Sequence, residues 1–297
     1  MTRKNIYLLL LILGTAFWGI SFSITKIAIG YGSSTVFLFY RFFLATIVLS
    51  LLFSKSLKKV SLKTFTIGAE LAVPLMLGIY LQTLGIKYSS ASQTSFVAGT
   101  TVILIPILKI ILYRKLAPAK VWIAASLALV GLSIISVKSD FTINIGDLYT
   151  IIGAFGFAYY LIRVEKHAKN VAIITTIVPM FGVCTLLSLA LVMVDSNRIW
   201  FPVHQEFWTG IFYCAILSTA YMYSISNLAQ QYLSSEQVSI IYLFEPIFGA
   251  IAASFLLGEL LTWKLVLGGS LIFFGMLISE LKINKFKFLT QRMINAE

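Results

Sequence analysis

The sequence is poor in charged residues and in the side chains that most enzyme sites need. Only 11% of its 297 residues are charged, whereas a soluble domain has roughly 25%. It contains two histidines and two cysteines. No cluster of His, Cys and carboxylate residues has metal-ligand spacing, and no glycine-rich phosphate loop is present. We therefore expect no metal, no cofactor, no ATP hydrolysis and no enzyme activity.

Apolar residues dominate instead. They make up 59% of the chain, and the mean hydropathy is +0.93. A water-soluble fold would have to expose much of this surface, so a lipid bilayer is the better solvent. Cys184 and Cys214 each lie in an apolar run and are expected to be small buried residues rather than a disulfide. The first apolar run is too long for a cleavable signal peptide.

The apolar runs have the length of membrane helices. Crossing about 30 Å of hydrocarbon takes roughly 20 residues as a helix. We therefore predict an all-α integral membrane protein with ten transmembrane helices. The predicted spans are approximately 6–29, 35–54, 66–86, 92–113, 120–137, 147–165, 171–194, 207–229, 236–257 and 263–281.

The basic residues are distributed unevenly between the two sides. With the N-terminus inside, 16 of the 23 Lys and Arg residues fall in inner segments and 4 in outer segments. The remaining three, Lys26, Arg41 and Lys109, lie within spans. Because Lys and Arg concentrate on the cytoplasmic side, both termini are predicted to be cytoplasmic. The net charge of +12 is then mostly a topology signal, and nucleic-acid binding is not expected.

Residues 88–138 are repeated at 232–282 with an offset of 144 and no gap. Matched pairs include Tyr88 and Tyr232, Gln93 and Gln237, Ser95 and Ser239, and Gly131 and Gly275. An internal repeat in a membrane chain is typical of a transporter built from two related halves. Five spans per half is an odd number, so the halves are inverted and can open alternately to each side. We predict five-helix repeats at 1–138 and 139–297.

A weaker match between the early parts of the halves, at an offset of 139, pairs Trp18 with Phe157. The repeats also differ in one respect. Pro246 has Val102 as its counterpart, while the proline of the first half is Pro106, one helical turn later. The two half-sites are therefore not expected to be symmetric in detail.

An ordered set of short motifs accompanies the repeat. The motifs are Gly14-Thr-Ala-Phe-Trp18-Gly19, Tyr40-Arg41-Phe42, Tyr88-Ser-Ser-Ala-Ser92, Glu245-Pro246, Gly258-Glu259-Leu-Leu-Thr262, and Gly268-Gly269 through Gly275. Together they resemble the drug/metabolite transporter (DMT) superfamily, specifically EamA-type permeases, over about residues 6–281. The resemblance implies two inverted five-helix repeats in a bacterial inner membrane, and a central cavity lined mainly by spans 1, 3, 4, 6, 8 and 9. It also implies transport of amino acids, other metabolites or drugs, often outward.

Ionisable residues within spans are candidates for function, because charge is costly in a bilayer. Glu245 lies near the middle of its span, and the proline after it loosens the helix near Tyr242. A carboxyl at this depth could bind substrate or act as a proton-coupled switch; capping or pairing at the kink is the structural alternative. Arg41 is expected to be structural or interfacial and to extend toward the outer interface. Lys26 is also expected to reach outward.

Glu70 and Lys109 fall toward the cytoplasmic ends of their spans. We expect them to pair with each other, with a cytoplasmic gate as the alternative role. Polar, small and aromatic residues at helical spacing predict stripes that face a cavity, although Gly and Ser can equally serve close helix packing. The candidate substrate-binding or coupling residues are Glu245, Tyr242, Trp18, Ser21, Gln82, Ser95, Gly99, Tyr160, Tyr221 and Asn227.

These features favour a secondary active transporter in the inner membrane. It would move a small metabolite, such as an amino acid or amine, by alternating access and in the export direction. Its expected partners are that substrate, a proton or another coupling ion, and the lipid bilayer, with the chain as a monomer or homodimer. A channel or a scaffold without coupled transport is the alternative function. A membrane-embedded enzyme is disfavoured, because His167 and His204 lie in loops on opposite faces.

Overall fold

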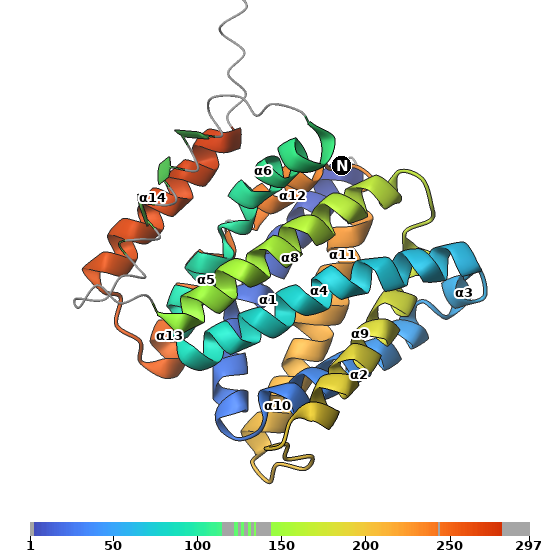
Figure 1. Cartoon of the computed structure of the whole chain (residues 1–297), viewed down its shortest axis with the longest axis horizontal. Coiled ribbons are helices and arrows are strands. Elements are labelled where there is room, and N and C mark those ends of the chain that lie inside the picture. Colours follow the sequence, from blue (N-terminus) through green and yellow to red (C-terminus); the bar gives the residue numbers. More distant parts are fainter. Residues whose placement is uncertain are drawn as a thin grey trace, which may run out of the picture.

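A computed structural model of the chain describes residues 3–114, 144–242 and 244–280, together with 122–123, 126–127, 130–131 and 134. All of the regular structure in these residues is helical, as expected for an all-α protein (Figure 1). The helices are α1 Arg3–Gly30, α2 Ser34–Leu52, α3 Ser54–Leu57, α4 Leu62–Tyr88, α5 Ala91–Ala98, α6 Thr101–Tyr113, α8 Ile145–Ala168, α9 Ile174–Val194, α10 Gln205–Tyr213, η1 Cys214–Tyr221, α11 Met222–Ala229, α12 Ser235–Ile241, α13 Phe244–Leu257 and α14 Trp263–Glu280.

Seven helical segments of the described chain are long and apolar enough to cross a membrane. They are α1, α2, α4, α5 with α6, α8, α9, and α12 with α13. The predicted span 207–229 corresponds to α10, η1 and α11, and the last predicted span corresponds to α14. The predicted span 120–137 lies largely outside the described residues. The count of ten spans and the placement of the termini therefore stay predictions.

The helices pack in pairs around α1 (Figure 1). α4 runs along α8 and also contacts α9, α2 lies against α9, and α1 lies against α13. The α4–α8 pair is close because glycine faces backbone there. A Cβ on Gly156 would lie 2.8 Å from the Pro74 carbonyl oxygen, and one on Gly153 would lie 2.9 Å from the Gly78 carbonyl oxygen. Small residues let membrane helices approach in this way, so these glycines serve packing.

Two spans are broken near their centres. The first breaks between α5 and α6, at Gly99 and Thr100, and the second has a turn at Tyr242, after α12 ends at Ile241. At the offset of 144, Thr101 corresponds to Glu245, so the breaks agree to within one residue. The displaced prolines do not move the two breaks. Pro106 lies inside α6, whereas Pro246 lies in the first turn of α13. A backbone N–H in that turn would have no partner within the helix, so the proline costs no hydrogen bond there. The two halves therefore break at equivalent positions and differ in the side chains that they carry there.

The helix of α10, η1 and α11 contains a π-helical segment at Cys214–Tyr221. Its i→i+5 hydrogen bonds take up more residues per turn than an α-helix. Residues after Tyr221 therefore face a different direction from the one that an uninterrupted α-helix would give them.

Candidate central cavity

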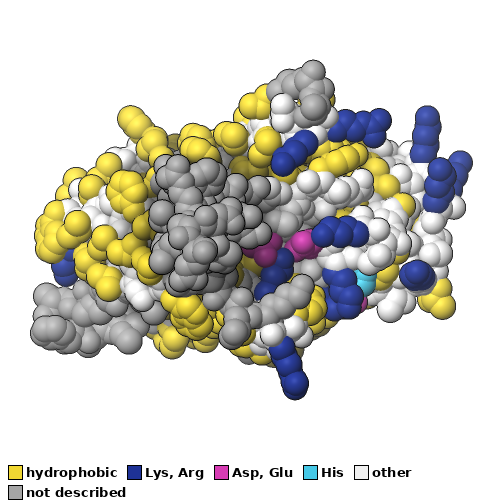
Figure 2. Space-filling model, turned by 90° about the horizontal axis from the view of Figure 1, so that it is seen from above, with side chains coloured by type: hydrophobic (Ala, Val, Ile, Leu, Met, Phe, Trp, Pro, Cys, Tyr) yellow, Lys and Arg dark blue, Asp and Glu magenta, His cyan; other side chains and the backbone are white. Residues whose placement is uncertain are grey.

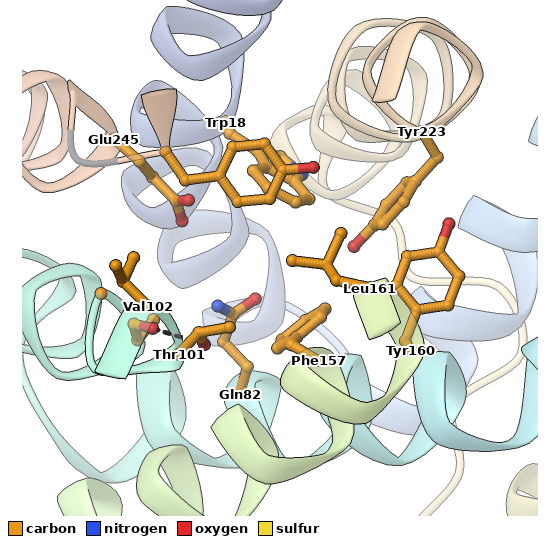
Figure 3. Close-up of a pocket in the computed structure, with 12 residues that line it drawn as sticks. Trp18, Gln82, Thr101, Val102, Phe157, Tyr160, Leu161, Tyr223 and Glu245 are labelled. Carbon is orange, nitrogen blue, oxygen red and sulfur yellow. Dashed lines mark hydrogen bonds between the residues drawn. The ribbon is translucent and has the colours of Figure 1, made fainter. Parts of the chain in front are cut away.

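A small cavity of about 30 Å³ lies between the two broken spans and four other helices (Figure 3). Its walls come from α1, α4, α5 with α6, α8, α11, and α12 with α13. This is the set of spans that the family resemblance implied. The lining residues are Trp18, Gln82, Ala98, Gly99, Thr101, Val102, Phe157, Tyr160, Leu161, Tyr223, Tyr242 and Glu245.

One wall of the cavity is aromatic. The Trp18 ring centroid lies 4.9 Å from that of Tyr242, 5.1 Å from that of Tyr223 and 6.4 Å from that of Phe157, all in edge-to-face geometry. Tyr223 in turn meets Tyr160 edge to face at 6.0 Å. Ring faces attract both apolar groups and cations. This wall can therefore hold a hydrophobic substrate or a positively charged one.

Glu245 brings a carboxyl group into the same cavity. It is in the first turn of α13, and only 8% of it is exposed. Figure 3 shows Glu245 and Gln82 extending into the cavity from opposite walls. Among the described residues, no ion pair or side-chain hydrogen bond reaches this carboxyl group. An unpaired carboxylate away from water is costly, so the site is suited to a proton or a cationic ligand.

The predicted site residues fall into two groups. Those that line the cavity are Glu245, Tyr242, Trp18, Gln82, Gly99 and Tyr160. Ser21, Ser95, Tyr221 and Asn227 do not line it. Ser21 donates to the Trp18 carbonyl at 2.6 Å, and Ser95 donates to the Ser92 carbonyl at 2.7 Å. Tyr221 lies against the α1 backbone, donating to the Leu10 carbonyl at 3.1 Å.

Asn227 lies behind the aromatic wall and supports it. Its Oδ1 accepts a 2.5 Å hydrogen bond from the Tyr160 hydroxyl. One residue earlier, the Ser226 hydroxyl lies 2.5 Å from the Tyr242 hydroxyl. Both contacts are fully buried on the α11 side. They fix the orientation of two rings in the cavity, so the contribution of Asn227 is indirect.

The sequence interpretation missed Phe157, Tyr223 and Thr101. Phe157 was detectable as the repeat counterpart of Trp18, and Thr101 as the counterpart of Glu245. Tyr223 was not, because an α-helical stripe through the eighth span selects Tyr221 instead. The π-helical segment before α11 changes which residues face inward. The amino-acid composition of Cys214–Tyr221 does not predict a π-helix.

Comparison with known proteins also divides the chain into two similar halves. The EamA-like transporter family matches residues 5–137 and again residues 144–281, so two copies cover most of the chain. The chain belongs to the EamA-like transporter family. It is therefore a multi-pass membrane protein of a transporter family, and the two matches coincide with the two halves of the internal repeat.

Relatives of this EamA-like transporter carry the same general description. An uncharacterized transporter of Archaeoglobus fulgidus is 25% identical over 90% of this chain and 83% of its own length. The uncharacterized transporter YyaM of Bacillus subtilis is 25% identical over 94% of this chain and 95% of its own. One crystal structure superposes with a TM-score of 0.67 at 15% identity, covering 98% of both chains. That likeness concerns the fold alone.

Two charged residues of this EamA-like transporter, Arg41 and Lys26, donate hydrogen bonds to other helices that the sequence did not predict. Arg41 is buried and does not extend to the interface. Its Nε donates to Thr219 Oγ1 at 2.7 Å, and its guanidinium donates to Ser218 Oγ at 3.2 Å. Lys26 is half-buried and donates to the carbonyl oxygens of Ile86 and Ser89 at the end of α4. These contacts favour the structural interpretation of Arg41 over the interfacial one, because hydroxyls solvate its guanidinium within the protein. The outward extension of Lys26 stays a prediction.

The predicted pairing of Glu70 with Lys109 is also wrong. Glu70 on α4 accepts from Arg163 and lies 3.2 Å from His167, both on α8. Lys109 on α6 bridges Glu165 at 2.7 Å and Glu236 at 2.6 Å. The close α4–α8 packing presents one turn of α8 to Glu70, and Lys109 faces the start of α12.

Within the described part of the chain, no group of three or more His, Cys, Asp or Glu side chains could hold a metal ion.

Proposed function

We propose that this transporter moves a small metabolite bearing a protonated amine by alternating access. The observation that carries the proposal is the unpaired Glu245 carboxyl beside the ring of Trp18. A carboxylate supplies charge, and an aromatic face supplies cation–π attraction that strengthens when water is excluded. Amines and amino acids share the ammonium group that this pairing would recognise.

Glu245 also offers a means of coupling. One carboxylate can hold either a proton or an ammonium group, but not both at full strength. Entry of the amine would displace a proton from Glu245, and entry of a proton would release the amine. If the loaded forms are the ones that change conformation, the proton gradient drives substrate outward. Transport in the export direction would follow.

The proposed setting is an inner membrane with both termini in the cytoplasm. Basic side chains gather on the right of the view in Figure 2, beside the few acidic ones visible there, whereas the left is mostly hydrophobic. A concentration of Lys and Arg is typical of the cytoplasmic side. The broken spans and the matching repeat halves support an inverted architecture, in which half-helices meet near the bilayer midplane.

The recognition group can be tested with three probes that share one ring. These are phenethylamine (a cation), phenylalanine (a zwitterion) and 3-phenylpropionate (an anion). We expect probes with an ammonium group to raise the melting temperature of the purified protein, and 3-phenylpropionate to leave it unchanged. The Glu245→Gln variant removes the negative charge with little change in shape, so it should lose this stabilisation.

The matched control is Glu206→Gln, at an exposed carboxylate on α10. It should respond to each probe as the unmodified protein does. Equal stabilisation by 3-phenylpropionate, or an unaltered ammonium response in Glu245→Gln, would refute recognition by Glu245.

A further inference from the structure

The two broken spans lie antiparallel beside each other. α5 contacts α13, and α6 contacts α12. The first residues of these spans, Ala91 and Ser235, are equivalent at the offset of 144. The cavity lies at the breaks. Each end of the cavity is therefore bordered by the start of one broken span and the end of the other.

At one end, Glu259 joins the end of the second broken span to the start of the first. Glu259 Oε1 accepts from the Ala91 N–H at 2.8 Å, and its Oε2 accepts from the Ser92 N–H at 3.1 Å and from the Ser92 hydroxyl. Gly258 has a left-handed φ of 65°, which glycine adopts without strain, at the turn that leads into Glu259. Lys26 lies within electrostatic range of Glu259. We call this the Glu259 contact.

At the other end, Lys109 joins the end of the first broken span to the start of the second. Its Nζ lies 2.7 Å from Glu165 and 2.6 Å from Glu236. Glu165 also accepts from the Ser235 hydroxyl at 2.7 Å and from the Ser235 N–H at 3.3 Å. Glu236 is the repeat equivalent of Ser92. We call this the Lys109 contact.

Equivalent positions are thus held by charge at both ends of the cavity. Residues 91 and 92 are held by Glu259, and residues 235 and 236 by Glu165 and Lys109. The bonds differ in chemistry. Those of Glu259 to residues 91 and 92, and those of Lys109 to Glu165 and Glu236, cross from one repeat to the other, whereas Glu165 and Ser235 belong to the same repeat. Both contacts are formed together in this structure. Opening toward either face requires the half-helices at that face to separate.

We propose that the Glu259 contact and the Lys109 contact are the two gates of the transport cycle, each closing the cavity to one face. The proposal rests on alternating access, as put forward above. Charge-assisted hydrogen bonds are strong when partly screened from water. Loss of one contact removes stabilisation from every state in which that end is closed. The population then shifts toward states open at that end.

The test reads the access of water to the cavity from each side of sealed vesicles. A cysteine in place of Val102, which lines the cavity, reports by its reaction with a membrane-impermeant maleimide. Lys109→Gln should speed labelling several-fold from the face that carries Lys109, because Glu165 and Glu236 are then left to repel each other. Glu259→Gln should speed labelling several-fold from the opposite face. A cysteine at the exposed Lys166 identifies the Lys109 face.

Matched controls are Lys169→Gln and Glu206→Gln. Lys169 also reaches Glu165, at 3.3 Å, but its side chain is 61% exposed, so its loss should change little. The chain without the reporter measures background from Cys184 and Cys214, which are both fully buried. Two milder variants, Ser92→Ala and Glu236→Gln, should give smaller shifts in the same directions if the stronger ones fold poorly.

Faster labelling from the same face in both gate variants, or rates equal to those of the controls, would overturn the proposal. Labelling requires no substrate, so it separates the gates from the substrate assignment. If Glu245→Gln binds amines normally while labelling shifts to opposite faces, the gates stand and the amine proposal fails. If labelling is unaltered while Glu245→Gln loses amine binding, the gate assignment alone fails.

Discussion

At the scale of single residues, Glu245 and Trp18 contribute different attractions to one cavity. The carboxylate supplies net charge, while the indole supplies a polarised face and packs edge to face with Tyr223 and Tyr242. A cation–π contact is worth about 2 kcal/mol when desolvated, and about 1.4 kcal/mol corresponds to a tenfold change in affinity. The ring and the carboxylate should therefore be separable by mutation.

We predict that Trp18→Leu weakens amine binding roughly thirtyfold, because it keeps apolar bulk but removes the aromatic face. Trp18→Phe keeps an aromatic face and should lose considerably less. Titration calorimetry with phenethylamine measures both affinities, and the melting temperature without ligand reports any packing defect. Equal losses in the two variants would show that Trp18 acts by volume rather than by its ring.

Single residues differ in how far the sequence predicts them. Glu245, Gln82 and Trp18 stand out because polar or aromatic side chains within apolar spans have few reasons to be there. The roles of Arg41 and Lys26 could not be predicted. Their partners are hydroxyls and carbonyls on distant helices, and only the rotation of each helix about its axis brings those groups within reach.

At the scale of elements, the site depends on the close approach of α1 to α13. A Cβ on Gly19 would lie 2.7 Å from the Glu245 carbonyl oxygen, and as close to the Gly249 nitrogen and to Phe248 Cβ. No side chain fits there without moving α13. The position of Glu245 in the cavity is therefore set partly by the absence of a side chain on the facing helix.

We predict that Gly19→Ala lowers stability by about 1–3 kcal/mol, the usual effect of overpacking, and also weakens amine binding. The control is Gly182→Ala in α9, where an added Cβ meets nothing within 4 Å and should be neutral or slightly stabilising. Thermal unfolding in detergent and ligand titration measure the two effects. Normal binding in a folded Gly19→Ala variant would mean that the α1–α13 distance does not set the site.

Elements were predicted best where apolar length alone defines them. The proline at Pro246 pointed to a loosened helix near Tyr242, and the structure breaks there. The equivalent break at Gly99 and Thr100 carries no proline, and the π-helical segment carries no composition signal at all. Both depend on how neighbouring helices fit together, which a single helix sequence does not specify.

At the scale of the whole molecule, the repeat explains why the cavity is bordered by two broken spans with equivalent positions. Two halves of similar sequence place a break in each of two adjacent spans, and Thr101 and Glu245 occupy equivalent positions at these breaks. The offset of 144 predicted the equivalence, and hydropathy predicted the all-helical membrane fold. The pairing of charges across the bundle was not predictable. The partners of Glu70 and Lys109 depend on how each helix is rotated about its own axis.

The central claim is that a protonated amine crosses the membrane through the cavity at Glu245. The most direct measurement is counterflow in proteoliposomes loaded with unlabelled phenethylamine and diluted into a trace of the labelled amine. We predict transient accumulation of label with the unmodified protein and with Glu206→Gln, and none with folded Glu245→Gln. Equal accumulation with Glu245→Gln would contradict the account, as would accumulation of labelled 3-phenylpropionate in place of the amine.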